Sequence, residues 1–270
     1  MISRLQGERL DSTPKQILGN GWTIRAISLA IFLIAWQIFG STVNPLIFVP
    51  PSKVAVRFVQ LWTTGGLPRD TIITIETVFI SLALSALIGI PVGLAMGLRK
   101  LVEYGIDPYI IFIYSLPIVV IIPLVVVWFG SNLWPSTYVI VFLHAIPPIL
   151  VNTLVGVKAM NKTLAETGKS FGMHGIVLLR KIIFPGALPY ILAGLRIGVG
   201  MAIVGTMIVE IFLYNTGLGY ELVFYQNRFD TAALIVGILV IMAVGIGSRE
   251  IIRIFEKRAL AWSAGATGVA

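Results

Sequence analysis

Residues 72–98 read IITIETVFISLALSALIGIPVGLAMGL, and Glu76 is the single charged side chain in this stretch. A helix that crosses a membrane needs about 20 consecutive, mostly apolar residues, and this run is longer than that. A helix is the expected form because lipid offers no hydrogen-bond partners to free backbone groups. The stretch therefore predicts a membrane-spanning helix.

Similar apolar runs recur along the chain, and together they predict an all-α, polytopic membrane protein with six transmembrane helices. The predicted spans are residues 23–40, 72–98, 107–129, 135–157, 186–212 and 231–249. Residues 23–249 then form the transmembrane domain. Residues 1–22 form an N-terminal segment, and residues 250–270 form a C-terminal tail.

The composition supports a membrane protein and excludes an ordinary soluble domain. Of the 270 residues, 57% are hydrophobic and 12% are charged, whereas soluble domains carry about 25% charged residues. The net charge of +8 does not indicate nucleic-acid binding, because no basic face with interleaved aromatic residues is present. The chain has no cysteine, so disulfides, thiol nucleophiles and thiolate metal sites are excluded.

The basic residues predict the orientation of the chain. Of its 20 lysines and arginines, Arg196 lies inside a span and four lie on one side: Lys53, Arg57, Arg69 and Arg228. All the others lie on the side of the two termini. Because basic loops stay in the cytoplasm, both termini are expected there. The charged first 22 residues do not resemble a cleavable signal peptide, so the first span is expected to be retained.

Prolines interrupt the third and fourth predicted spans. Pro108, Pro117 and Pro123 fall in the third, and Pro147 and Pro148 fall in the fourth. Interior proline removes a backbone hydrogen bond and bends a helix. Such a bend can serve packing alone, or it can form a gate or a cavity wall beside a transport pathway.

Glycines recur at helical spacing in the second and fifth spans. Gly89, Gly93 and Gly97 follow each other every four residues, as do Gly194 and Gly198. Small residues on one helix face allow close approach of a second helix. We therefore interpret these glycines as packing positions.

Ionisable residues inside the spans are candidates for function, because their burial in a membrane is costly. Glu76 can be an interfacial residue at the outer end of the second span. His144 can be a hydrogen-bonded packing residue or line a pathway. Arg196 can extend toward the cytoplasm, pair with an acid or attract an anion. Glu210 lies near the outer end of the fifth span, where it can brace the outer loop.

The segment between the fourth and fifth spans reads NKTLAETGKSFGMHGIVLLRKIIFPGALPY over residues 161–190. It predicts two short amphipathic helices, residues 165–171 and 175–184, separated near Gly172 and Gly175. Gly172 can supply the positive φ of a helix C-cap, and Pro185 marks the entry to the next span. A basic amphipathic helix lying on the membrane surface is the alternative interpretation.

This segment resembles the EAA loop of bacterial ABC importer permeases. The motif has Glu-Ala-Ala, three residues, Gly, nine residues, then Ile, any residue and Leu-Pro. Glu166, Gly172, Ile182 and Pro185 match it in register. The chain departs from it at three positions, which are Thr167, Gly168 and Phe184. Gly168 weakens the first short helix by up to about 1 kcal/mol relative to alanine.

Other stretches resemble the nitrate, sulfonate, taurine and bicarbonate permeases of this family. The matching stretches, in chain order, are Asp107-Pro108, Ile122-Pro123-Leu124, Trp128-Phe129-Gly130, Pro148-Ile149-Leu150, Asn152-Thr153, Gly186-Ala187-Leu188-Pro189, Gly194-Leu195-Arg196, Gly217-Leu218-Gly219-Tyr220, Phe229-Asp230-Thr231 and Glu256-Lys257-Arg258 with Trp262. Each is weak alone, but their order and spacing over most of the chain make the resemblance specific.

The resemblance implies a type I ABC importer permease in a bacterial inner membrane, with a cytoplasmic coupling helix in residues 161–185. The coupling loop would comprise Ala165, Glu166, Thr167, Gly168, Phe171, Gly172, Ile182 and Pro185. Pro117, Pro123, His144 and Arg196 are the pathway candidates.

The resemblance also implies the partners, which are a dimer of cytoplasmic ABC ATPase subunits, a second permease subunit forming a homodimer, and a periplasmic or lipid-anchored substrate-binding protein. ATP would be bound by the ATPase, because this chain has no Gly-x-x-x-x-Gly-Lys-Ser/Thr loop and needs no cofactor. The expected substrate is a small anion such as nitrate, a sulfonate or taurine. Permeases of aromatic acids or vitamin precursors are the alternative.

Two other classes fit the sequence less well. A membrane enzyme would need paired acids or histidines at one depth, and a metal site would need such a cluster too; the sequence shows neither. An ion channel would need a short re-entrant filter loop, for which residues 214–230 are the only candidate. That segment matches the permease family better.

Overall fold

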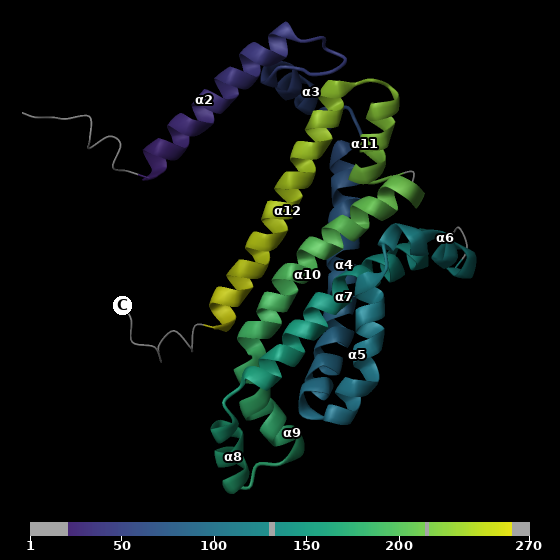
Figure 1. The fold of residues 1–270 in the computed structure, drawn as a ribbon. Helices are drawn as coiled ribbons and strands as arrows, with labels where there is room; N and C mark the ends of the chain where they lie inside the picture. The colour runs from purple at the N-terminus through teal and green to yellow at the C-terminus, as the bar shows by residue number, and fades with distance from the viewer. Residues whose placement is uncertain (1–20, 130–132, 214–215, 261–270) are drawn as a thin grey trace, which may run out of the picture.

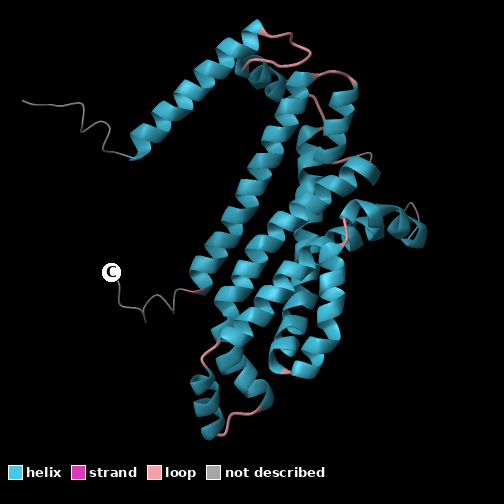
Figure 2. Cartoon of the chain, in the orientation of Figure 1, coloured by secondary structure: helices cyan, strands magenta, loops and turns pink. Residues whose placement is uncertain are grey.

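A computed structural model describes residues 21–129, 133–213 and 216–260, and this part of the chain is helical without any strand (Figure 2). The helices, in chain order, are α2 (Gly21–Thr42), α3 (Pro51–Thr63), α4 (Leu67–Leu98), α5 (Lys100–Ser115), α6 (Ile118–Phe129), α7 (Leu133–Ala159), α8 (Lys162–Ser170), α9 (Gly175–Leu178), the π-helix η1 (Leu179–Ile183), α10 (Phe184–Leu213), α11 (Leu218–Asn227) and α12 (Thr231–Ala259). The all-α prediction is confirmed. Most of the predicted N-terminal segment and the end of the predicted tail, including Trp262, lie outside the described residues.

Five of the helical segments are long and apolar enough to cross a membrane. They contain α2, α4, α7, α10 and α12, and each covers one predicted span. The number rises to six when the bent pair α5 and α6 counts as one span. The prediction of six spans therefore holds in this sense.

The third predicted span is not one continuous helix. The prediction of a single bent helix over residues 107–129 is therefore wrong. The chain forms α5 and α6 instead, with a bend of 105° between them. The break falls at Leu116, whose backbone is extended, with φ −78° and ψ 122°. Pro117 explains this conformation, because a proline disfavours the helical conformation of the residue before it. Pro108 and Pro123 stay inside helices.

Helix α7 packs between α4 and α10, and the predicted glycine positions lie at these two contacts. A Cβ on Gly93 would lie 2.7 Å from the Leu150 carbonyl oxygen of α7. A Cβ on Gly194 would lie 2.9 Å from Asn152, also on α7. The packing interpretation of these glycines is therefore confirmed: only glycine lets the backbones approach so closely.

The largest cluster of buried apolar side chains lies where α4, α6, α7 and α10 meet. Its members include Val78, Leu82, Ile122, Val125, Ile140, Val141, Ile149, Val199 and Val209. Helix α6 thus packs into the bundle beside α7 despite the sharp bend that precedes it.

Figure 1 shows how the elements are distributed along the bundle. Helices α3 and α11 lie at one end. The α4–α5 connection, the short helices α8 and α9 and the C-terminal end of α12 lie at the opposite end. Helix α2 runs away from the other spans, and only 6% of its most apolar 18-residue window is buried, against 61% for α7.

Candidate functional site

The segment between α7 and α10 forms a compact hairpin, which we call the coupling hairpin and define as residues 161–185. It consists of α8, a turn at 171–174, α9 and η1. Asn161 caps the start of α8, because its side-chain oxygen accepts a hydrogen bond of 2.9 Å from the Thr163 N–H. Such a cap satisfies one of the free donors at a helix N-terminus. The two predicted short helices are present, with somewhat different bounds.

Gly172 ends α8 in the conformation that the sequence predicts, with φ +78°. Its N–H donates to the Lys169 carbonyl at 2.9 Å, and the Met173 N–H donates to the Gly168 carbonyl at 3.0 Å. This pair of bonds is the Schellman motif, which closes a helix and turns the chain away. No atom lies within 4 Å of a Cβ built on Gly172, so the positive φ alone requires glycine there.

The hairpin is held together by contact between its two arms. Gly168 is buried, and a Cβ at this position would overlap with the Cδ1 of Ile182. The motif has alanine at this position. In this chain the side chain of Ile182 occupies the volume that the methyl group of that alanine would need, which explains the glycine. Leu178 and Ile183 continue this packing into a cluster with Leu94 of α4. The hairpin is thus connected by apolar contacts to the bundle.

Helix α10 begins directly after η1. The hairpin and the span are therefore joined without a loop, and the π-helix changes to an α-helix at this point. The Phe184 N–H donates to the Leu179 carbonyl, a bond one residue longer than in an α-helix. Pro185 has no N–H, so it cannot bond the carbonyl four residues earlier. Such π-turns often occur at functional sites.

The outer surface of the hairpin carries large apolar side chains beside charged ones. Phe171 is 79% exposed and Ile176 is 71% exposed, and Leu164 is also exposed. Glu166 and Thr167 are exposed as well, and Thr167 donates back to the Thr163 carbonyl. Ala165 and Pro185 are half-buried. Several large apolar side chains exposed on a polar, basic hairpin suit a surface that contacts another molecule.

The four predicted pathway residues lie on different elements. Pro117 lies at the α5–α6 break, and Pro123 lies inside α6. His144 lies on α7, where its ring is 3.6 Å from a Cβ built on Gly205 of α10. Gly205 and Arg196 are nine residues apart on α10, which is about 13 Å along the axis.

Arg196 forms an ion pair with Glu256 of α12, so the interpretation that it pairs with an acid is the one observed. A second pair, Lys158 with Glu103, joins α7 to α5. These pairs tie the helices that flank the coupling hairpin, α7 and α10, to their neighbours. His144 and Arg196 remain separate candidates for a pathway.

A buried polar cluster lies at the opposite end of the bundle, and we call it the α11 clamp. The Gly217 N–H donates to Asp70 at 2.8 Å. The Leu218 N–H donates to the Thr74 hydroxyl at 3.0 Å, and the Gly219 N–H donates to Glu210 at 2.8 Å. Thr74 in turn donates to Glu210 at 2.7 Å. The clamp therefore satisfies the free N–H groups at the start of α11.

The clamp requires glycine at two positions. Gly217 has φ +95°, and a Cβ there would overlap with the carboxyl of Glu210. A Cβ on Gly219 would lie 2.7 Å from the Cβ of Glu210. The prediction that Glu210 braces the outer loop is confirmed. The sequence did not indicate Asp70 and Thr74 as members of this cluster. Their partners at the start of α11 lie 147 and 144 positions away along the chain, so no local pattern links them.

Glu221 lies in the first turn of α11, next to the clamp. Burial raises the pKa of its carboxyl above the ordinary 4.5; a hydrogen bond from Tyr225 lowers it, and the charge of Asp70 raises it further. Its Oε2 is buried and has no hydrogen-bond partner among the described residues. Burial also raises the pKa of the Tyr225 phenol.

Glu76 is exposed on α4. No group of three or more histidines and acids among the described residues could hold a metal ion.

Comparison with protein-family models matches residues 85–260 to the family described as "Binding-protein-dependent transport system inner membrane component". The taurine transport system permease protein TauC of Escherichia coli is 28% identical over 247 residues, which cover 89% of this chain and 90% of that protein. The bicarbonate transport system permease protein CmpB of Synechococcus elongatus is 30% identical, over 80% of this chain and 81% of that protein.

A putative aliphatic sulfonates transport permease protein, SsuC of Bacillus subtilis, is 26% identical over 90% of this chain and 88% of its own length. Among solved structures, a chain of the inward-facing MetNI methionine ABC transporter has a TM-score of 0.56 and 19% identity. It matches 69% of this chain and 94% of its own. A chain of an amino acid ABC transporter has a TM-score of 0.60, also at 19% identity, and matches 76% of this chain and 96% of its own. These likenesses show the same fold.

Proposed function

The chain belongs to the family of binding-protein-dependent transport system inner membrane components, and on this premise we propose that it forms one half of the translocation path of an ATP-driven importer. Its relatives are transport permeases, and the chain is a permease rather than an enzyme. We propose further that the coupling hairpin binds a cytoplasmic ABC ATPase subunit.

One observation carries this proposal. The hairpin protrudes at one end of the bundle, is capped at both ends of α8 and is packed internally, yet it exposes Phe171 and Ile176 (Figure 1). A rigid element with an exposed apolar patch is suited to transmit motion from a docked partner. Because Leu178 and Ile183 pack against the bundle, a movement of the hairpin reaches α4 and α10.

A second permease subunit, most simply another copy of this chain, would complete the pathway. The apolar surface of α2 supports this, since α2 makes few contacts within its own chain. A substrate-binding protein would deliver the solute at the end of the bundle where α3 and α11 lie. The uneven distribution of basic residues supports an inner-membrane protein with both termini in the cytoplasm.

The substrate that we propose is a small organic or inorganic anion. Relatives named for sulfonate, taurine and bicarbonate transport support this class. A relative named for formylaminopyrimidine transport, ThiX of Halalkalibacterium halodurans, is 29% identical over 236 residues. Because of this relative, a heterocyclic vitamin precursor remains the alternative substrate.

Co-expression with candidate ABC ATPase subunits and binding proteins tests the proposal. The chain should copurify with an ATPase, and reconstituted vesicles should take up taurine, an alkanesulfonate, bicarbonate or nitrate only when ATP and the binding protein are present. If a formylaminopyrimidine were the one solute taken up, the assignment as a permease would stand and the proposed substrate class would change. Uptake without an ATPase, or failure to bind any ATPase, would contradict the proposal.

A further inference from the structure

Helix α3 has a buried side that faces the protein and an apolar side that is largely exposed. Val54 and Leu61 are buried in the cluster with α12. Phe58, Val59 and Trp62 lie on another side and are exposed. The helix has 13 residues, too few to cross a bilayer. A short helix with such an apolar side is suited to lie in the membrane interface.

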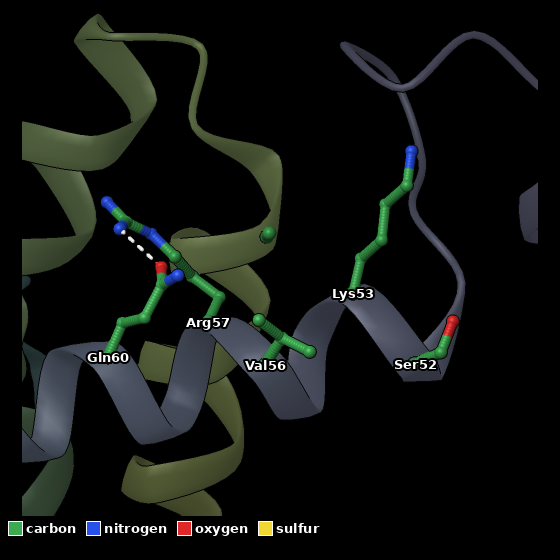
Figure 3. A pocket seen from close by; sticks show the side chains of 6 residues that line it. Ser52, Lys53, Val56, Arg57 and Gln60 are labelled. Atoms are coloured by element: carbon green, nitrogen blue, oxygen red, sulfur yellow. Dashed lines mark hydrogen bonds between the residues drawn. The ribbon is translucent and has the colours of Figure 1, made fainter.

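The remaining side of α3 carries polar residues and lines an open surface cavity of about 330 Å³ whose wall is mostly apolar. Figure 3 shows Lys53 and Arg57 extending from the same side of the helix, with the Lys53 ammonium near the preceding loop and the Arg57 guanidinium beside Gln60. The lining residues are Ser52, Lys53, Val56, Arg57, Gln60 and Ala232. The cavity therefore combines polar donors with an apolar edge that leads toward the exposed apolar side.

The charges in the cavity favour an anion. Arg57 donates to Asp230 at 2.7 and 3.1 Å and to Gln60 at 3.1 Å, which fixes the guanidinium in place. Its other two N–H donors make no hydrogen bond within the described part of the chain. Lys53 is exposed, and within the described ranges no acid pairs with it. One positive charge at the cavity is thus uncompensated.

We propose that this cavity binds the headgroup of an anionic phospholipid. The phosphate would contact the Lys53 ammonium, while Arg57, held by Asp230 and Gln60, forms the other end of the cavity. The acyl chains would follow Val56 and the apolar side of α3. A lipid is the occupant because the uncompensated charge of Lys53 adjoins the exposed apolar side of α3, which is suited to lie in the membrane interface. The inference rests on the membrane location given by the proposed function.

Native mass spectrometry of the purified transporter, exchanged into mixed phosphatidylglycerol and phosphatidylcholine, tests this site. Wild-type protein should retain phosphatidylglycerol in preference to phosphatidylcholine. Lys53→Gln should lower that retention about fivefold, which corresponds to one basic residue at an anionic surface. Arg69→Gln is the matched control, since it removes the same charge from α4 at the same end of the bundle and should retain the lipid. Arg57 is left unchanged because it braces Asp230.

Equal retention of phosphatidylglycerol by the Lys53→Gln and wild-type proteins would overturn the proposal. So would displacement of the lipid by inorganic phosphate or taurine at the same cavity, which would assign it to a soluble anion. The chain has no cysteine, so a Lys53→Cys variant that formed a disulfide-linked dimer would instead assign this surface to a second copy. Each of these results can occur while the ATPase still copurifies, so they are distinct from failure of the proposed function.

Discussion

The hydroxyl of Thr74 both donates to Glu210 and accepts from Leu218, so it connects α4, α10 and α11 at one point. Thr74→Val keeps the shape and removes both bonds. Because it leaves a buried N–H without an acceptor, we expect a loss of about 1–3 kcal/mol in the free energy of unfolding. Denaturation in detergent measures the change. Thr71→Val on the same helix is the control, since Thr71 donates to the Leu67 carbonyl within its own helix; an equal loss in both variants would refute the role of the clamp.

Gly217 is a second residue on which the clamp depends. Gly217→Ala places a Cβ against Glu210 at a backbone with φ +95°, so unfolding should become easier by more than about 1 kcal/mol. Gly247→Ala provides the comparison, because a Cβ at that exposed position in α12 meets nothing within 4 Å. That change should be neutral or raise the melting temperature slightly. If the two variants melt alike, the described geometry of Gly217 is wrong.

Glu221 gives the stability of the clamp region a dependence on pH. Its folded pKa is raised above 4.5, so the folded state holds the proton more tightly than the unfolded state. The associated stability is fully present below pH 4.5 and is lost as the pH rises through the folded pKa. Glu221→Gln should therefore gain stability relative to wild type as the pH increases. Melting curves of both proteins across this range measure the difference; a gain toward low pH would reverse the sign and exclude the explanation.

The coupling hairpin depends on the fit between its two arms. Gly168→Ala should strengthen α8 by up to about 1 kcal/mol but displace the Cδ1 of Ile182. Ile182→Val removes that atom. We therefore expect Gly168→Ala to lower the melting temperature alone, and the double variant to recover it. Hydrogen exchange in α8 measures the same effect locally, and additive behaviour of the two changes would show that the residues do not interact.

The elements also show where sequence reasoning succeeds. Long apolar runs and local signals determine the five continuous spans and the hairpin, so Gly172 could be interpreted from its neighbours alone. The Asn161 cap was not predicted, and α8 begins at Lys162 rather than at residue 165. The 105° bend between α5 and α6 could not, although Pro117 marked its place. A proline indicates that a helix is interrupted, but the direction of the chain after it depends on the packing of Ile122 and Val125 against α7.

At the scale of the whole molecule, the sequence predicted the fold class, the number of spans and the family. It could not predict the α11 clamp or the Arg196–Glu256 pair, because both join residues that are distant along the chain. The helices α3 and α11 were also not predicted, since each is too short to stand out from the loops that contain it. The candidate pathway residues were individually plausible, but the fold places them on separate elements.

The central claim is that the coupling hairpin transmits ATP-driven motion. It is tested most directly by ATP hydrolysis and solute uptake in vesicles that contain the full transporter, for Glu166→Lys and Gly172→Val. Both positions are exposed, and Gly172 requires its φ of +78°. The account predicts that both variants fold but lose uptake and the stimulation of ATP hydrolysis by loaded binding protein, whereas Glu76→Gln keeps both. Full uptake with normal stimulation in both hairpin variants would contradict it.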